Sequence, residues 1–148
     1  MRILLPLLAF FVASCQSGPS SMQRMLQKGA RQLSAQEVAQ FYAKETAYFE
    51  GWEWTKNVIR YEMRPNGKII VHAPGKTRWG VDSKSYGDIY LNSTGQWCVS
   101  WRYRNMERAK SSKDDCFVWI EKEPNVYRIY FMWEKWVADN VKRTKKPE

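Results

Sequence analysis

The sequence has few of the residues on which metal sites and nucleophilic active sites depend. Its 148 residues include one histidine, His72, and three cysteines. A zinc site of the common kinds needs several His and Cys ligands at short spacing, and a Ser-His-Asp or Cys-His site needs a base that a third group orients. Nothing beside His72 in the sequence supplies such partners. We therefore expect no metal, no cofactor and no catalytic residue of these kinds.

Long apolar runs and an excess of acidic residues are also lacking. The apolar run at the start of the chain, residues 3–13, has 11 residues, whereas a helix that crosses a bilayer needs ~20. The chain has 24 Lys and Arg against 15 Asp and Glu, a net charge of +9. This balance favours an anionic partner such as a lipid, a polysaccharide or a nucleic acid. A basic surface that only keeps the protein soluble is the alternative.

The first residues have the pattern of an export signal: a short basic start, then an apolar run of signal-peptide length that ends in Val12-Ala13-Ser14-Cys15. This ending resembles the lipobox of bacterial lipoproteins. The resemblance implies cleavage before Cys15, a diacylglycerol on its sulfur and a fatty acid such as palmitate on its new amino group. Gln16 in place of an aspartate implies the outer membrane, by resemblance to enterobacterial sorting. Plain secretory cleavage after Ser14 is the alternative.

Four segments follow from this interpretation. We predict a signal peptide over 1–14, the lipidated cysteine and a tether over 15–32, a single β-rich domain over 33–141 and a basic tail over 142–148. The expected location is the cell envelope, with the protein lipid-anchored in the outer membrane and facing the periplasm. A nucleic acid is then not expected as a natural partner.

The composition of the domain predicts a mainly β fold, because its apolar residues are mostly Trp, Tyr, Phe, Val and Ile. Turn signals such as 64–67 separate seven to eight short strands, which suggests an antiparallel meander or a barrel-like sheet. One helix is predicted over about 34–44. Ser34 and Glu37 have capping-box spacing before an apolar face that includes Phe41. We expect this helix to cover or plug one side of the sheet.

The strand at about 96–103 is the expected centre of the fold. Alternation places Trp97, Val99 and Trp101 on one face and Cys98 on the other. Export would place the domain in an oxidising space, and Cys98 and Cys116 are the two cysteines left once Cys15 is acylated. We predict a disulfide between them, which closes a loop of 17 residues and contributes ~3 kcal/mol in the chain-entropy model.

An ordered set of motifs resembles the DUF995 family of exported alphaproteobacterial proteins. The set consists of Leu33-Ser34-Ala35-Gln36-Glu37 with Phe41-Tyr42, Met63-Arg64-Pro65-Asn66-Gly67, Trp79-Gly80-Val81-Asp82, Gly95-Gln96-Trp97-Cys98-Val99-Ser100-Trp101 and a later Cys116. Dense tryptophans and a longer basic loop between the cysteines depart from the family pattern. The resemblance implies an exported, disulfide-bearing β domain of unsettled role, and it offers no catalytic residues to transfer.

The candidate binding residues lie in and beside the loop between the two cysteines. They combine aromatic rings with positive charge: Trp101, Arg102, Tyr103, Arg104, Arg108, Lys110 and Lys113. We predict a non-catalytic, lipid-anchored domain that binds an anionic envelope polymer, lipid headgroups or an acidic protein. The alternatives are an inhibitor or binder of a wall-active hydrolase, a carrier of a small hydrophobic ligand, and a weak hydrolase that uses carboxylates.

Overall fold

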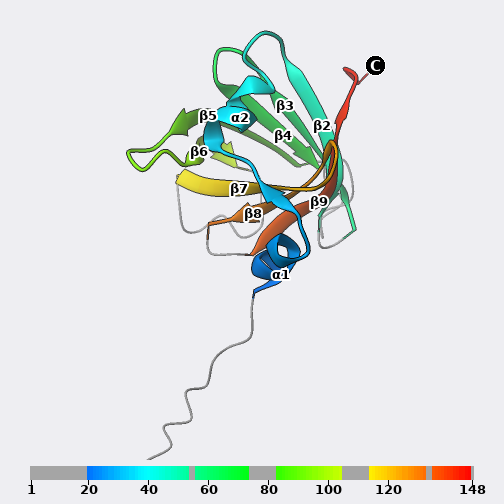
Figure 1. The fold of residues 1–148 in the computed structure, drawn as a ribbon. Coiled ribbons are helices and arrows are strands. Elements are labelled where there is room, and N and C mark those ends of the chain that lie inside the picture. The colour runs from blue at the N-terminus through cyan, green and yellow to red at the C-terminus, as the bar shows by residue number, and fades with distance from the viewer. Residues whose placement is uncertain (1–19, 54–55, 74–82, 105–113, 133–134, 148) are drawn as a thin grey trace, which may run out of the picture.

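A computed structural model describes residues 20–53, 56–73, 83–104, 114–132 and 135–147. Strands make up most of these residues (Figure 1). The elements, in chain order, are α1 (Ser21–Gln27), β1 (Arg31–Gln32), α2 (Ala35–Gln40), β2 (Ala47–Glu53), β3 (Val58–Met63), β4 (Lys68–Ala73), β5 (Ser83–Leu91), β6 (Trp97–Arg104), β7 (Asp114–Glu123), β8 (Val126–Phe131) and β9 (Trp136–Thr144).

Strands β2 to β9 form a closed antiparallel barrel. Each pairs with its neighbour in the chain, and β2 also pairs with β9, which closes the ring. The two-residue β1 adds to β7 beside the barrel, through Arg31 opposite Glu121 and Gln32 opposite Ile120. The mainly β, barrel-like fold expected from the sequence is therefore confirmed. A strand expected within residues 76–82 lies outside the described residues.

The hairpin expected at 64–67 forms between β3 and β4. Arg64 N–H donates to the carbonyl of Lys68 at 2.9 Å, and Gly67 N–H donates to the carbonyl of Arg64 at 2.9 Å. Gly67 has φ of +76°, a conformation that only glycine adopts without strain. The turn sets the pairing of the two strands, so that Met63 lies opposite Ile69.

Helix α2 begins as the capping box predicts. The Ser34 hydroxyl accepts from Glu37 N–H at 3.1 Å, and the Glu37 carboxylate accepts from Ser34 N–H at 2.7 Å. The helix ends at Gln40 rather than near 44. Its end tightens through bonds from Phe41 and Tyr42 to the carbonyls three residues before them. Phe41 and Tyr42 then pack with the barrel core instead of continuing the helix.

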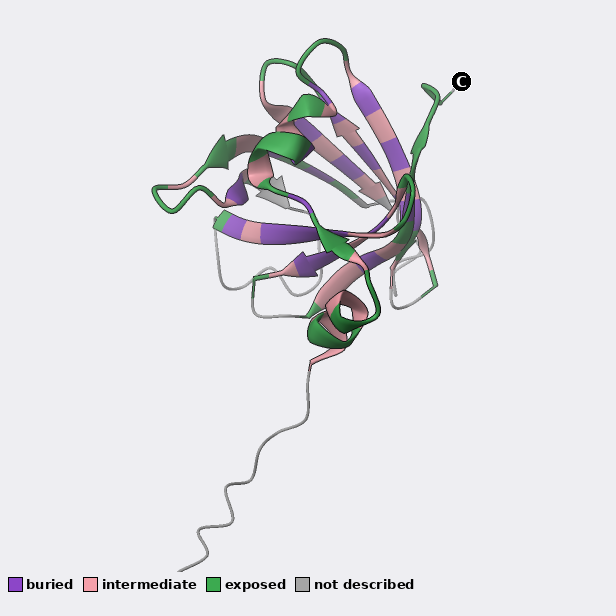
Figure 2. Ribbon diagram, viewed as in Figure 1, coloured by how far each residue is buried: buried purple, intermediate pink, exposed green. Residues whose placement is uncertain are grey.

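The core lies inside the barrel, where every second strand residue points inward. This alternation appears as buried and less buried bands along the strands (Figure 2). Trp97 and Val99 are buried, and Trp101 is partly buried and packs against them. Phe41 enters from α2 with its ring centroid 5.3 Å from that of Phe49 and 5.8 Å from that of Trp119. As expected, the helix plugs one end of the sheet.

Ordered structure extends beyond both boundaries drawn for the domain. Residues 15–32, predicted as a tether, contain α1 and β1, and α1 starts with its own capping box between Ser20 and Gln23. At the other end β9 continues to Thr144, where it lies opposite Tyr48 of β2. The first three residues of the predicted tail thus belong to the barrel. In the described part of the chain, no helix is long and apolar enough to cross a membrane.

Candidate binding surface

Strand β6 places the first two residues of the predicted binding loop on opposite faces. The Trp101 indole Nε1 donates to Oδ2 of Asp115 at 2.8 Å, and Asp115 is buried, so this ring belongs to the barrel interior. Arg102 points outward, with its side chain 67% exposed, and forms an ion pair with Asp88 of β5. Trp101, which the sequence analysis named among the candidate binding residues, is therefore partly buried and packs against the barrel core.

Two further residues of the predicted binding loop belong to β6. The backbones of Tyr103 and Arg104 continue β6 and pair with Tyr86 and Ser85 of β5. Arg108, Lys110 and Lys113 lie outside the described residues. Of the predicted site, the structure thus places one cation, Arg102, on an outer face.

Two tyrosines that the loop prediction did not include lie on this same face. Tyr86 and Tyr90 point outward from β5 and are 41% and 37% exposed. Neighbouring outward side chains come from β4 and β6. We call this surface the tyrosine face; it comprises Lys68, Ile70, Lys84, Tyr86, Asp88, Tyr90 and Arg102. The i, i+2 spacing of Lys84, Tyr86, Asp88 and Tyr90 along β5 is visible in the sequence. The spacing alone does not show that this side of the strand lies outside the barrel.

The tyrosine face rests on a tightly packed wall. Gly87 lies inward between the two tyrosines, and a Cβ there would come within 2.6 Å of Val99 Cγ1 and 3.2 Å of Trp101 Cε3. Because only glycine lets these two side chains approach, β5 and β6 pack closely behind the face. On β6, Cys98 lies opposite Tyr90 and is joined to Cys116 of β7. The predicted disulfide is thus present and links the strands next to the face.

An acidic side chain organises the charge of the tyrosine face. The Asp88 carboxylate forms ion pairs with Lys68 on one side and Arg102 on the other. Hydrogen bonds from Lys68 and then Arg102 lower the pKa of Asp88 below its ordinary value, although desolvation opposes this shift. Desolvation, followed by the nearby charge of Asp114, raises the pKa of Tyr90, so its hydroxyl is neutral at physiological pH.

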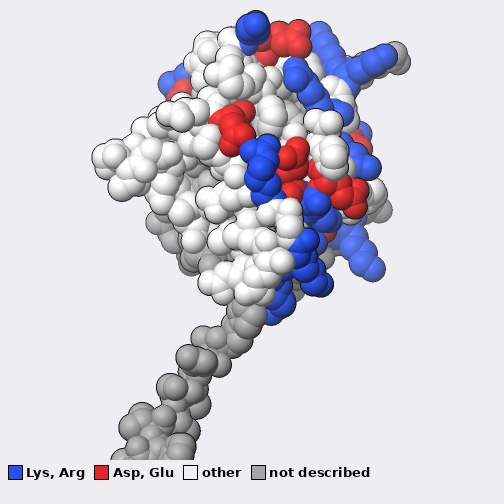
Figure 3. Space-filling view, in the orientation of Figure 1, with Lys and Arg blue, Asp and Glu red and all other residues white. Residues whose placement is uncertain are grey.

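The β5–β6 turn next to the face carries no charge. Residues 89–101 contain no Lys, Arg, Asp or Glu, and Leu91 is 46% exposed. In the space-filling view this part of the molecule is white, whereas charges of both signs alternate over the other side (Figure 3). The surface therefore combines flat rings, hydroxyl groups and two fixed cations with an uncharged margin.

A shallow cleft of about 250 Å³ lies elsewhere on the barrel, where α2 and β1 meet β6 and β7. Leu33, Val38, Trp97 and Trp119 are among its lining residues. Sites for small molecules have volumes of roughly 300–1,000 Å³, so this cleft is small for a carried ligand. Among the described residues no group of three or more His, Cys, Asp or Glu side chains is arranged to hold a metal ion.

Two polar groups inside the barrel have no hydrogen-bond partner. They are the hydroxyl of Tyr61 and the indole N–H of Trp119, and both side chains are buried. Both contact the same neighbourhood, because Tyr61 lies opposite Phe49 and the Trp119 ring centroid is 5.4 Å from that of Phe49. Burial, and then the negative charge of Glu53, raise the pKa of Tyr61. Tyr61 therefore stays protonated at physiological pH.

Comparisons of the chain with protein-family models, with curated proteins and with solved structures find no match.

Proposed function

We propose that this protein is a non-catalytic binding domain of the bacterial cell envelope. In this proposal, lipid on Cys15 anchors the protein to the outer membrane. The tyrosine face binds an envelope component that bears carboxylates or phosphates. The resemblance to exported DUF995 proteins belongs to the same proposal. The observation that carries it is the pair of exposed rings, Tyr86 and Tyr90, beside Lys68 and Arg102 on a firm β surface.

Aromatic side chains on a rigid strand are suited to recognition. A tyrosine contributes a large contact area and loses little conformational entropy on binding, and its hydroxyl supplies a hydrogen bond. Exposed aromatic residues and arginine are enriched in the energetically important parts of interfaces. Lys68 and Arg102 on the same face add attraction for an anionic group, whereas Asp114 lies near Tyr90. Strands β4, β5 and β6 are each paired with a neighbour on both sides, so recognition at the tyrosine face depends on side chains rather than on strand addition.

The alternatives have less support in the described structure. A carrier of a hydrophobic ligand would need interior space, but Phe41, Phe49, Trp97 and Trp119 fill the α2 end of the barrel with ring contacts. An inhibitor of a wall-active hydrolase would act through a protruding loop, and residues 105–113 of the loop between the two cysteines lie outside the described residues. No specific observation therefore favours a second function.

Binding measurements on the soluble Cys15→Ser domain test the surface. The probes are soluble peptidoglycan fragments, lipopolysaccharide and anionic vesicles. Tyr86→Ala with Arg102→Ala should weaken binding at least tenfold, and added salt should weaken binding of the wild type. The matched control is Trp52→Ala with Arg60→Ala, an exposed ring and a cation on the outer face of β2 and β3. Equal losses from both pairs would show that net charge and general apolar area, not the tyrosine face, attract the ligand.

The anchor requires its own experiment. Membrane sedimentation of the wild type and of Cys15→Ser should differ, since a diacylated or triacylated cysteine exceeds the two-signal requirement for stable attachment. The wild type should sediment with membranes, and the variant should be released or remain unprocessed. Equal partitioning of two correctly processed proteins would contradict the lipoprotein assignment.

A further inference from the structure

Helix α1 is attached to the outside of the barrel by a small apolar core of its own. Met22, Met25, Leu26 and Ala30 pack against Val118 and Ile120 of β7 and Tyr130 of β8, and Trp136 of β9 packs against the same three residues. This cluster is separate from the barrel interior. Figure 1 shows α1 against the outer side of β8 and β9, at the point where the described chain begins.

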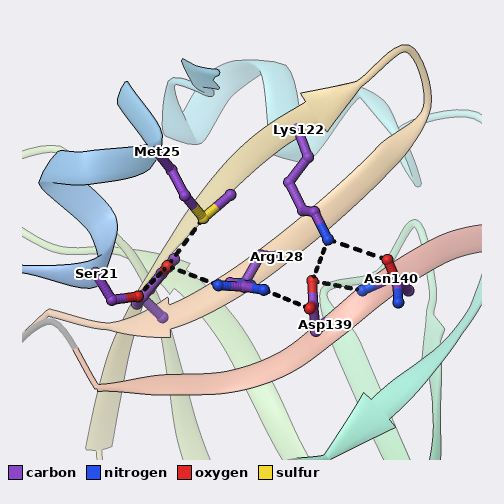
Figure 4. Close-up of polar contacts among 7 residues, drawn as sticks. Ser21, Met25, Lys122, Arg128, Asp139 and Asn140 are labelled. Carbon is purple, nitrogen blue, oxygen red and sulfur yellow. Dashed lines mark hydrogen bonds and ion pairs between the residues drawn. The ribbon is translucent and has the colours of Figure 1, made fainter. Parts of the chain in front are cut away.

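Polar contacts strengthen this attachment. The fully buried Tyr130 hydroxyl lies 2.9 Å from Ser21 Oγ and 3.1 Å from Met25 Sδ (Figure 4). Arg128 approaches the same hydroxyl at 3.5 Å and lies over the Trp136 ring at 5.6 Å from its centroid. Residues at both the start and the middle of α1 are therefore connected to one tyrosine of the barrel wall.

The wall beneath α1 is tied to β9 by Asp139. Its carboxylate pairs with Arg128 and, at 2.8 Å, with Lys122 (Figure 4). Burial opposes ionisation of Asp139, but hydrogen bonds from Arg128 and Lys122 outweigh it and lower the pKa to about 2. The charged network joins β7, β8 and β9 across the surface next to the helix, so α1 rests on a rigid part of the barrel.

The tyrosine face lies across the barrel from α1. The ring of strands runs in chain order from β2 to β9 and then closes. The face is centred on β5 with contributions from β4 and β6, whereas α1 covers β7, β8 and β9. In a ring of eight strands, β4 stands opposite β8 and β5 opposite β9. If a membrane lies next to the α1 side of the barrel, the tyrosine face therefore points away from that membrane.

We infer that α1 turns the tyrosine face away from the membrane that holds Cys15, and that the partner of this face is a carboxylate-bearing glycan of the cell wall. The inference rests on the lipid anchor of the proposed function. Four residues, 16–19, lie between Cys15 and Ser20. The five Cα–Cα steps limit the span to about 18 Å even for an extended chain. The start of α1 must stay near the lipid headgroups, and the docked helix brings the β7–β9 side with it.

The chemistry of the tyrosine face agrees with a glycan partner. Sugar rings present flat C–H faces that stack on tyrosine, and hydroxyl groups that can bond the tyrosine hydroxyls. Arg102 and Lys68 share Asp88, and Lys84 is the third cation of the face, so its partly compensated positive charge suits isolated carboxylates. The dense charge of a lipid surface would favour uncompensated cations. The uncharged β5–β6 turn would allow a polymer to continue past the face.

Paramagnetic relaxation tests the orientation on the acylated full-length protein in nanodiscs with nitroxide-labelled headgroups. We expect the amide signals of Arg24 and Lys28 in α1 to lose more than half of their intensity. The amide signals of Tyr86, Asp88 and Tyr90 should keep theirs. The affinity for soluble peptidoglycan fragments should stay within twofold of that of the free Cys15→Ser domain, because membrane attachment leaves the face accessible.

A helix variant provides the matched comparison. Leu26→Asp places a charge in the apolar contact of α1, while Gln27→Asp adds the same charge on its exposed side. Leu26→Asp should free the helix and let the Tyr86 and Tyr90 signals weaken, and Gln27→Asp should leave them unchanged. The barrel core does not include Leu26, so both variants should keep the dispersed barrel spectrum.

The outcomes separate this inference from the proposal on which it rests. Strong broadening at Tyr86 and Tyr90 in the wild type, or a tenfold loss of fragment affinity on the membrane, would overturn the orientation and leave the anchor intact. Preference of the face for anionic vesicles over wall fragments would overturn the glycan assignment alone. Failure of the wild type to associate with nanodiscs, with no difference from Cys15→Ser, would contradict the lipid anchor itself.

Discussion

Aromatic side chains inside the barrel and on the tyrosine face belong to the same residue types but have different neighbours. Inside, Phe49 contacts Phe41, Trp119 and Tyr127 with ring centroids 5.3 to 6.2 Å apart. Outside, Tyr86 is 41% exposed beside ion pairs. A buried ring contributes to folding through its removal from water and its packing, whereas an exposed ring keeps most of that contact area for a partner. Whether an aromatic side chain stabilises the fold or remains available for binding therefore depends on which face of the strand it occupies, not on its residue type.

The largest expected effect on the free energy of unfolding comes from removing one interior aromatic ring. Phe49→Ala should lower the free energy of unfolding by about 3–5 kcal/mol, because it removes a buried ring and leaves a cavity. Tyr86→Ala should change it by no more than about 0.5 kcal/mol, as is usual for surface sites. Urea unfolding followed by tryptophan fluorescence measures both values. Similar costs at the two positions would mean that Tyr86 also supports the fold.

The disulfide sharpens the comparison, because it lies on the outer side of β6 and β7 beside Tyr90. Replacing both Cys98 and Cys116 by Ala should lower the free energy of unfolding by about 3 kcal/mol through the loss of a covalent loop. Intact mass of the wild type should rise by two hydrogens on reduction. If both thiols of the folded, envelope-derived wild type react with an alkylating reagent before reduction, the bridge is absent in the cell.

Two carboxylates that each hold two cations allow the α1 side and the tyrosine face to be compared electrostatically. Asp139 is 18% exposed and its pKa is lowered from 3.8 to about 2. A lowered folded-state pKa stabilises the protein above the unfolded value of 3.8 and loses this contribution as pH falls towards the folded value. The pH-dependent contribution should be about 2 kcal/mol at neutral pH.

Urea unfolding of the wild type and Asp139→Asn across the acid range measures this contribution. The gap between the two proteins should be constant above about pH 5 and should shrink as pH falls towards 2. Asp88→Asn on the more exposed tyrosine face should cost clearly less than Asp139→Asn, and the cost should diminish in salt. A gap for Asp139→Asn that does not change with pH would show that its carboxylate has no lowered pKa.

The smallest expected effect concerns the unpartnered hydroxyl inside the barrel. Tyr61→Phe removes a buried polar group without a partner, so the free energy of unfolding should stay the same or rise by up to about 1 kcal/mol. The same exchange at Tyr130, whose hydroxyl contacts Ser21 and Met25, should instead lower it by about 1 kcal/mol. A clear loss at Tyr61 would reveal an internal partner, such as a bound water or a small ligand.

Local features of the fold were predictable because few neighbouring residues determine them. The Ser34–Glu37 capping box and the turn at Gly67 depend on short-range hydrogen bonds and on the backbone freedom of glycine. The inward row of Trp97, Val99 and Trp101 followed from strand alternation. The end of α2 was predicted four residues too late, because packing of Phe41 and Tyr42 into the core decides where that helix stops.

The candidate site was less predictable, since it depends on which strands meet. The sequence pointed to the aromatic and basic loop after Trp101, but Trp101 bonds to buried Asp115 and faces inward. Tyr86 and Tyr90 joined Arg102 only through the pairing of β5 with β6. Alternation shows that two side chains share a face, but it does not show which face is covered when several strands curve into a ring.

The sequence by itself determined the strand-rich class and the interior row of β6, because composition and alternation are local properties. It also indicated the pairing of Cys98 with Cys116, on the premise that Cys15 is acylated and leaves Cys98 one partner. Tertiary structure decided the closure of β2 onto β9, the docking of α1 on β7 to β9 and the position of the tyrosine face across the barrel. These features depend on register and curvature summed over eight strands, and no short segment of the chain contains that information.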